Sequence, residues 1–358
     1  MVLVNDPGSL DHIYPQLKHA AWHGWTFTDW IFPFFLFIVG VSMTFSFDRR
    51  MEEGAERRLL VRHIVRRSVI IFALGLFVNG FPFWLNPDFS LSTFRIPGVL
   101  QRIAICYLLA GVIVLRTTAR GQAGWIVGLL GLYWLMVKLI PVPGYGAGNL
   151  EPEGNLLWYV DSTILSGHTW VHAPAQGFDP EGTISTIPAI ATTLIGFLTG
   201  HWIRSARMGE EKTVWMFVIG HVLLLLGLIL DMWLPINKNM WTSSYVVFMG
   251  GWSLISLATF YWLIDVRGYI RWSKPFIILG RNAIALFVLA ETVWTTLWVV
   301  SWTGSDGTAI ALHDFLFDTI FAPLASPINA SLFFAIGYVL LIFIVGWMLH
   351  RRNLFIRI

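Results

Sequence analysis

The sequence contains few charged residues. Asp, Glu, Lys and Arg make up 13% of its 358 residues, whereas hydrophobic residues make up 56%. Soluble domains carry about 25% charged residues, so this composition excludes a soluble globular protein. The apolar residues instead form blocks of about 20, the length that a helix needs to cross a hydrocarbon core of ~30 Å. The mean hydropathy of +0.66 and the 19 tryptophans, many at block edges, are typical of a protein embedded in a membrane.

The sequence also lacks the motifs of several common chemistries. Its single cysteine, Cys106, lies within an apolar block, so disulfide bonds give no information on the compartment. Without a GxSxG, Walker or GxGxxG motif, hydrolase and NTPase chemistry have no support. Several histidines have the spacing of a helical metal site, but without cysteine ligands or an HExxH pattern we expect no metal. These histidines are His12, His19, His23, His168 and His172.

Hydropathy predicts an all-α polytopic membrane protein with nine complete transmembrane helices. Lipid offers no hydrogen-bond partner to an open strand edge, so helices are the expected spanning element. The predicted spans are residues 28–47, 65–84, 96–115, 122–141, 183–203, 213–233, 242–264, 275–298 and 330–350. Residues 1–5 look like the last turn of a helix, and we expect them to be the remnant of a preceding span. No repeat or linker divides the chain into two domains.

Lysine and arginine predict which loops face the cytoplasm. Most of the 24 lie in alternate loops, and the positive-inside rule places such loops in the cytoplasm. This set comprises Arg49, Arg50, Arg57, Arg58, Arg62, Arg66, Arg67, Arg116, Arg120, Arg204, Arg207, Lys212, Arg267, Arg271, Lys274, Arg351, Arg352 and Arg357. The predicted extracytoplasmic loops, about 5–27, 142–182 and 299–329, hold little positive charge. They are rich in Gly, Pro, Trp and acidic residues, as expected of a sugar site.

Two histidines lie just outside the first complete span. A neutral imidazole accepts a proton near physiological pH, so His19 or His23 could act as a general base. On position alone, an interfacial polar residue beside tryptophans is the simpler explanation. Asp29, at the start of the span, could cap the helix or orient a histidine.

Four polar residues lie within predicted spans, where ionisable groups are costly and usually face the bundle interior. Arg102 and Glu291 lie at similar depth in the outer half, and we predict that they form an ion pair. Separate satisfaction of each by backbone or water is the alternative. Arg281 and Asn282 lie in the inner half of the eighth span. They could contact the phosphate or pantetheine part of a cytoplasmic nucleotide, or form an interhelical clasp.

Several segments, in order along nearly the whole chain, resemble the heparan-α-glucosaminide N-acetyltransferase family. They are VNDPGS…LKHAAWHGWTFTDWIFPFFLFIVG at 4–40, RIPGVLQRIAICY at 95–107, FDPEGTISTI at 178–187, PINKNMWTSSYV at 235–246, GRNAIALFVLAE at 280–291 and the terminal RRNLFIRI. RIPGVLQR and PINKN are the most specific of them. The resemblance implies a single transmembrane acyltransferase domain over residues 1–358. Acetyl-CoA would enter from the cytosol and point its pantetheine arm through the bundle.

The resemblance also implies the residues of the site. The family's active-site histidine falls in the KHAxW motif, at His19, and the asparagine ahead of it matches Asn5. With Asp29 these form the expected catalytic set. The matching segments supply five substrate-binding candidates, Asp179, Glu181, Asn237, Lys238 and Asn239, and two cofactor-binding candidates, Arg281 and Asn282.

The expected activity is transfer of an acetyl group from cytoplasmic acetyl-CoA to the amine of a glucosamine-type sugar outside. His19 would be the general base or the acetyl acceptor, with Asn5 polarising the carbonyl or placing the amine. The alternative is an amino-sugar or N-acetylglucosamine transporter, because a many-span bundle with buried charges also suits a permease. The lumenal domain of lysosomal members is absent, which favours a bacterial inner-membrane enzyme. The expected partners are membrane lipid and a second copy in a homodimer, with no nucleic acid.

Overall fold

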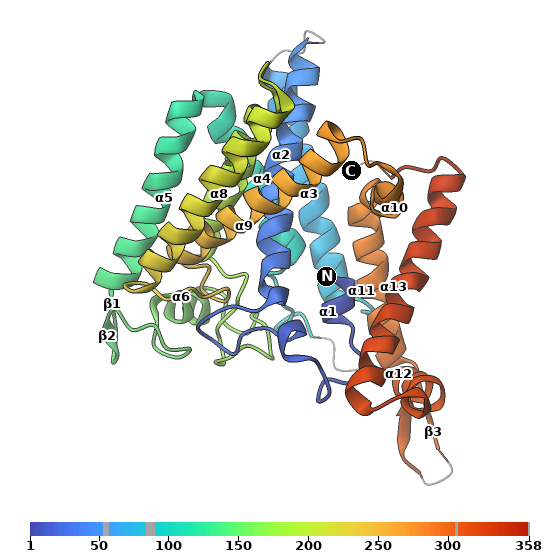
Figure 1. Cartoon of the computed structure of the whole chain (residues 1–358). Coiled ribbons are helices and arrows are strands. Elements are labelled where there is room, and N and C mark those ends of the chain that lie inside the picture. Colours follow the sequence, from blue (N-terminus) through green and yellow to red (C-terminus); the bar gives the residue numbers. More distant parts are fainter. Residues whose placement is uncertain (53–56, 84–89, 305–306, 357–358) are drawn as a thin grey trace.

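The computed structural model describes residues 1–52, 57–83, 90–304 and 307–356, and describes only the backbone of residues 48–52 (Figure 1). Of the predicted cytoplasmic cations, Arg357 and the side chains of Arg49 and Arg50 therefore lie outside the described part of the chain.

The described chain is almost entirely helical. The α-helices are α1 (Val2–Asn5), α2 (Ile31–Glu52), α3 (Arg57–Gly80), α4 (Val99–Arg116), α5 (Ala119–Leu139), α6 (Leu156–Ile164), α7 (Thr186–Arg204), α8 (Gly209–Asp231), α9 (Ser243–Tyr261), α10 (Lys274–Gly280), α11 (Ala283–Val299), α12 (Leu312–Leu316) and α13 (Pro327–Arg351). Short 3-10 or π turns cover Pro15–Leu17, Phe27–Trp30, Trp262–Val266, Arg271–Ser273, Phe317–Phe321 and Ala322–Leu324. Two antiparallel hairpins pair β1 (Pro141–Val142) with β2 (Gly146–Ala147) and β3 (Ser301–Thr303) with β4 (Ala309–Ala311).

The structure confirms a membrane-spanning helical bundle but not the predicted count of nine spans. Within the described residues, seven helices are long and apolar enough to cross a membrane, or eight if a bent pair is one span. The bent pair, Arg271–Gly280 with Ala283–Val299, turns by 70° inside the predicted span 275–298. The predicted span 65–84 falls on α3, which is helical over 24 residues but carries arginines through its first half and is not among the seven.

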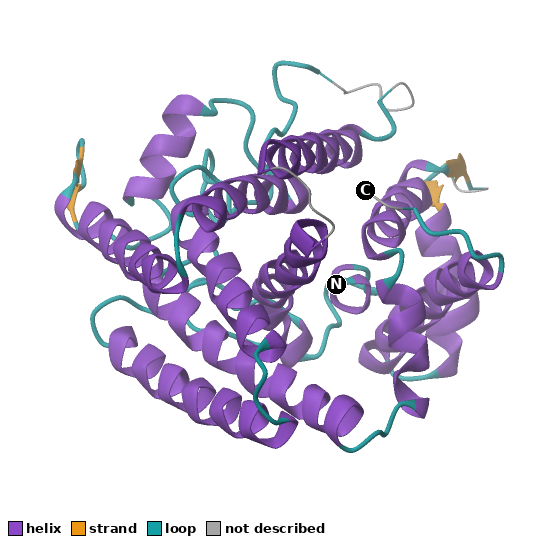
Figure 2. Cartoon of the chain, turned by 90° about the horizontal axis from the view of Figure 1, so that it is seen from above, coloured by secondary structure: helices purple, strands orange, loops and turns teal. Residues whose placement is uncertain are grey.

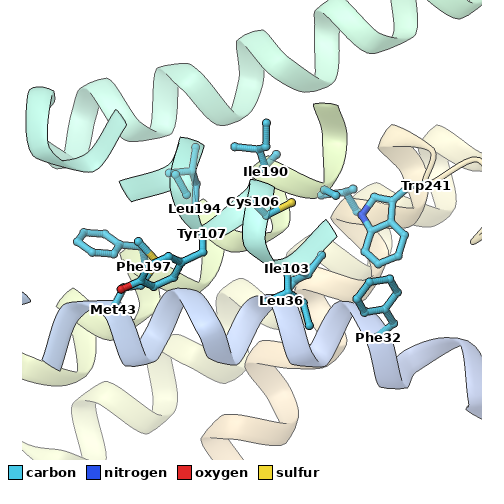
Figure 3. Packing of buried hydrophobic residues seen from close by; sticks show 14 of the residues in the cluster. Phe32, Leu36, Met43, Ile103, Cys106, Tyr107, Ile190, Leu194, Phe197 and Trp241 are labelled. Carbon is cyan, nitrogen blue, oxygen red and sulfur yellow. The ribbon is translucent and has the colours of Figure 1, made fainter. Parts of the chain in front are cut away.

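The main core lies between α2, α4, α7 and α9. It contains Phe32, Leu36, Met43, Ile103, Cys106, Tyr107, Ile190, Leu194, Phe197 and Trp241, all buried (Figure 3). Helices α2 and α7 pack closely because glycines face the neighbouring backbone at two positions. A Cβ atom added at Gly40 would collide with the Thr193 carbonyl, and one at Gly196 with the Phe37 carbonyl. Small residues allow this close approach in membrane bundles.

Helices α3, α5 and α8 pack on this core, whereas α10–α13 form a second group beside it. Seen end-on, α10–α13 lie to one side of the other helices, and the N-terminal turn α1 lies between the two groups (Figure 2). Helix α1 contacts α13, and α11 contacts α3. The segments 5–27, 142–182 and 299–329 gather at one end of the molecule, the lower end in Figure 1, which we call the loop face. The opposite end is the basic face.

Candidate active site

A cavity of about 500 Å³ lies between the loop face and helices α1, α3, α4 and α11. Its polar lining comprises Asn5, Lys18, His19, Asn79, Arg95, Gln101, Glu181, Lys238 and Glu291. Apolar side chains, among them Phe32, Val78, Leu100 and Phe287, form much of the remaining wall. The cavity thus joins charged groups at the loop face to an apolar interior.

The His19 imidazole at this cavity is held by a buried carboxylate. Its Nδ1 atom lies 2.6 Å from Oδ1 of Asp29; the Asp29 side chain is 1% exposed and that of His19 47% exposed. Asp29 also accepts hydrogen bonds from the backbone N–H groups of Ala20 and Thr26, at 3.1 and 2.9 Å. An ionised carboxylate only accepts hydrogen bonds, so Nδ1 carries the proton and Nε2 of the neutral ring is a proton acceptor.

This geometry follows from a short stretch of sequence. Thr26 and Asp29 form a capping box at the 3-10 turn Phe27–Trp30, which leads into α2. Because Asp29 is also bonded to Ala20, the chain from residue 19 to residue 29 folds back onto the start of the span. Asp29 therefore does both things that its position predicts: it caps the helix and orients His19.

Lys238 also contacts the imidazole of His19. Its Nζ atom lies 3.2 Å from Nε2 and 3.3 Å from Nδ1 of His19. Burial lowers the pKa of Lys238, while the nearby carboxylates of Glu181 and Asp29 oppose this shift. Because this amine is nearly equidistant from the two ring nitrogens, it lies over the imidazole ring rather than along the lone pair of Nε2.

Arg95 ties together the acidic turn that borders the cavity. Its guanidinium donates to both oxygens of Asp179, at 2.9 and 2.8 Å, and to Glu181 at 2.7 Å. Burial alone would lower the pKa of Arg95, but these carboxylates raise it. Burial would likewise raise the pKa of Glu181, but Arg95, then Arg102 and Lys238, hold it below its ordinary value. Glu181 is therefore an ionised carboxylate at the cavity wall.

The structure corrects the predicted ion pair between Arg102 and Glu291. Arg102, 1% exposed, donates to the Gly182 carbonyl at 3.3 Å and to the Ser185 hydroxyl, and its guanidinium lies 5.0 Å from the Trp241 ring centroid. Glu291 accepts a hydrogen bond from Asn5 instead. The reason is that the turn at 179–185 enters the bundle and supplies oxygen acceptors to Arg102, whereas Glu291 belongs to the other helix group.

Three of the predicted substrate-binding residues do not line the cavity. Asp179 is 0% exposed, and Arg95 and backbone N–H groups bond both of its oxygens. Asn237, also 0% exposed, accepts from the Met240 N–H at 2.9 Å and lies 3.3 Å from His23. Asn239 is half-buried in the same loop. Only Glu181 and Lys238 of this set reach the cavity.

Arg281 and Asn282 lie away from the cavity, at the break between α10 and α11. The Asn282 amide donates to the Leu354 carbonyl at 3.1 Å and accepts from the Ile356 N–H at 2.8 Å. Arg281 lies 3.2 Å from His350 and 5.3 Å from the Phe355 ring centroid. Both residues contact the C-terminal segment at the helix break, as a clasp would, and nucleotide binding by them stays a prediction.

Arg95, Asn79 and Gln101 at the cavity were not assigned roles by sequence reasoning. Arg95 could have been found, because it is one of the few cations between spans outside the predicted cytoplasmic set and begins the specific motif RIPGVLQR. Asn79 and Gln101 carry no comparable signal. Among the described residues, no group of three or more His, Cys, Asp or Glu is arranged to hold a metal ion.

Fold and site together define a polytopic helical membrane protein with a histidine–carboxylate pair beside an interhelical cavity. The sequence profile of the family described as "Heparan-alpha-glucosaminide N-acetyltransferase, catalytic" matches residues 4–229. The chain belongs to this family. The matched region contains His19, Asp29, Arg95 and Glu181, whereas Lys238 lies just beyond it.

Two curated relatives extend the likeness over more of the chain. Human heparan-alpha-glucosaminide N-acetyltransferase is 27% identical over 362 residues, covering 87% of this chain and 54% of the human protein. The mouse protein of the same name is 28% identical over 342 residues, covering 82% of this chain and 51% of its own length. The chain thus spans about half the length of the curated relatives it matches.

Proposed function

We propose that this protein is a transmembrane N-acetyltransferase that moves an acetyl group from acetyl-CoA to the amine of a glucosamine-type sugar. The observation that carries the proposal is the His19–Asp29 pair at the wall of the cavity. The names of the two relatives supply the reaction class and the acceptor type. Acetyl-CoA is a co-substrate in this scheme.

The chemistry needs a base at this point. An amino sugar is substantially protonated at neutral pH, and its nitrogen must be neutral to attack the thioester carbon. In our scheme the ammonium form first releases one proton to water, and Nε2 of His19 then takes a second proton from the neutral amine as the C–N bond forms. The C–S bond then breaks, and the imidazolium returns the proton to the thiolate. The variant mechanism places the acetyl group on Nε2 before the amine attacks.

The surrounding charges have separate roles in this proposal. Asp29 fixes the ring so that Nε2 points away from it and stabilises the imidazolium. Glu181, ionised and at the cavity wall, attracts the positively charged acceptor amine. Lys238 lies over the ring, and the nearby Glu181 carboxylate gives its ammonium group a partner when the acceptor binds.

The proposal also includes an arrangement in the membrane. The basic face would be cytoplasmic and the loop face extracytoplasmic, in a bacterial inner membrane, with α3 and the bent pair completing nine spans. We expect the enzyme to act as a homodimer. The arrangement is supported by the distribution of the 24 lysines and arginines.

Vesicles that contain the purified protein separate transfer from transport. With labelled acetyl-CoA sealed on the side of the basic face and glucosamine on the other side, we expect labelled N-acetylglucosamine outside. The transporter alternative predicts counterflow of labelled sugar in vesicles without acetyl-CoA. Counterflow without any transfer of label would contradict the proposed function.

A charge change at Lys238 is expected to alter the pH dependence of the reaction. The Lys238 ammonium group lies 3.2 Å from Nε2 of His19, so its removal lowers the free energy of the protonated ring relative to the neutral one. In Lys238→Met the acidic limb of kcat/KM should therefore move to higher pH, by about one pH unit. The measurement is a pH–rate profile of the variant beside Lys138→Met, which removes the same charge from the end of α5. An unmoved acidic limb in Lys238→Met would show that this amine does not act on His19.

A further inference from the structure

The cavity wall contains one buried amide with an unused donor. Gln101, in the first turn of α4, is 2% exposed, and its Nε2 atom has no hydrogen-bond partner among the described residues. Its Oε1 atom lies close to Gly75 of α3 and Gly98, where an added Cβ atom would collide with it. These two glycines make room for the carboxamide. The oxygen end is packed against them, and the NH2 end is the one left without a partner.

The other amides of the cavity are already engaged. Asn79 uses its side-chain N–H groups on the carbonyls of Arg95 and Pro97, at 3.0 and 2.8 Å. Asn5 donates to Glu291. Buried polar groups without a partner are uncommon because desolvation is not repaid, and at a cavity wall a ligand or a water supplies the missing partner. Gln101 therefore points to a ligand with a hydrogen-bond acceptor.

The surroundings of Gln101 indicate which ligand this is. Val78, Leu100 and Phe287 of the same cavity wall are apolar, so a ligand segment that lies against them must be mostly apolar too. A sugar ring, which carries hydroxyl groups on every side, would leave several of them unpaired here. The thiol end of an acyl-CoA fits better, because it is a thin chain of CH2 groups with isolated carbonyl oxygens.

We propose that the Gln101 amide donates a hydrogen bond to a carbonyl oxygen at the thiol end of the acyl donor. This inference rests on the proposed acetyltransferase function and adds a residue that positions the donor. Two carbonyls have the right chemistry: that of the thioester, and that of the first amide beyond the sulfur. In the first case Gln101 also stabilises the oxyanion that forms when the amine attacks.

Three donors distinguish these cases in the purified full chain with glucosamine as acceptor. Acetyl-CoA carries both carbonyls, as does S-acetyl-N-acetylcysteamine, whereas S-propyl thioacetate carries only the thioester. The test variant is Gln101→Met, which keeps the length of the side chain but not the donor. Gln122→Met is the control for a buried glutamine outside this cavity. Gln122 donates to the Thr117 carbonyl at 3.3 Å, so this variant loses a hydrogen bond and should lose stability.

If Gln101 binds the amide carbonyl, Gln101→Met should lower kcat/KM about 3- to 10-fold for the two amide-containing donors only. If it binds the thioester carbonyl, kcat should fall with all three donors, by about 10²-fold. In both cases the ligand-free variant should unfold at the same temperature as the wild type or higher, because no hydrogen bond has been removed.

Wild-type kinetics of Gln101→Met with acetyl-CoA would overturn the inference, as would a loss of thermal stability in that variant as large as the loss in Gln122→Met. An inactive wild type would instead remove the proposed function itself. The two failures are therefore distinguishable.

Discussion

Replacing His19 by alanine is expected to lower kcat/KM for acetyl transfer by about 10²- to 10⁴-fold, the usual contribution of a positioned general acid–base group. The loss follows from geometry. Asp29 bonds Nδ1 at 2.6 Å, so Nε2 is the ring atom left to accept the amine proton and return it to the thiolate. Steady-state acetylation of glucosamine by the purified protein measures the effect.

His23→Ala is the matched control for this variant. His23 lies four residues away, beside the same tryptophans, but its ring contacts Asn237 and does not line the cavity. We expect its activity to stay within a few-fold of wild type. Near-normal activity of His19→Ala would remove both the general-base and the acetyl-histidine mechanism. Single-turnover experiments without acceptor separate those two, because only the covalent route produces acetyl-enzyme.

Replacing Arg95 by methionine is expected to cost roughly 3–5 kcal/mol of folding free energy, the usual cost of leaving a buried carboxylate without its partner. Asp179 is fully buried and receives two of the three Arg95 hydrogen bonds. The same change releases Glu181 from the cavity wall, so activity should fall together with stability. Thermal unfolding of the purified protein, followed beside acetyl transfer, measures both effects.

A double variant separates these two consequences of losing Arg95. Arg95→Met with Asp179→Asn removes the unpaired charge at the fully buried position 179, so part of the lost stability should return. Activity should stay low, because Glu181 still lacks its anchor. Arg95→Lys should be intermediate, since an ammonium cannot make the paired contact to Asp179. Wild-type stability of Arg95→Met would contradict the role assigned to this cluster.

Hydropathy located most of the helices but could not describe their shape. The predicted spans 96–115, 183–203 and 330–350 lie within a few residues of α4, α7 and α13. The predicted span 275–298 instead contains a 70° bend near Arg281 and Asn282. Hydropathy averaged over a window does not detect a break in a helix. Asn282 satisfies its side chain at this break through hydrogen bonds to Leu354 and Ile356. Such partners cannot be read from local sequence.

The contacts of the candidate site are of two kinds: some join residues that are close in sequence, and others join residues that are far apart. His19 and Asp29 are only ten positions apart, so both roles of Asp29, capping the helix and orienting a histidine, could be proposed from the sequence. The contact of Arg95 with Asp179 joins residues 84 positions apart, and no single-sequence signal says which loops meet. Arg102 and Glu291 were paired by depth alone. Depth in the membrane does not show that the turn at 179–185 supplies the hydrogen-bond acceptor of Arg102.

A structure determined with acetyl-CoA and an unreactive acceptor analogue tests the central claim most directly. The account predicts the acetyl carbonyl in the cavity lined by His19 and Gln101, with the acceptor nitrogen within about 3.2 Å of Nε2 of His19. A second cavity, of about 620 Å³, is lined by Arg57, Thr118 and His201 at the basic face. A thioester bound there, with the cavity at His19 empty of both substrates, would contradict the account.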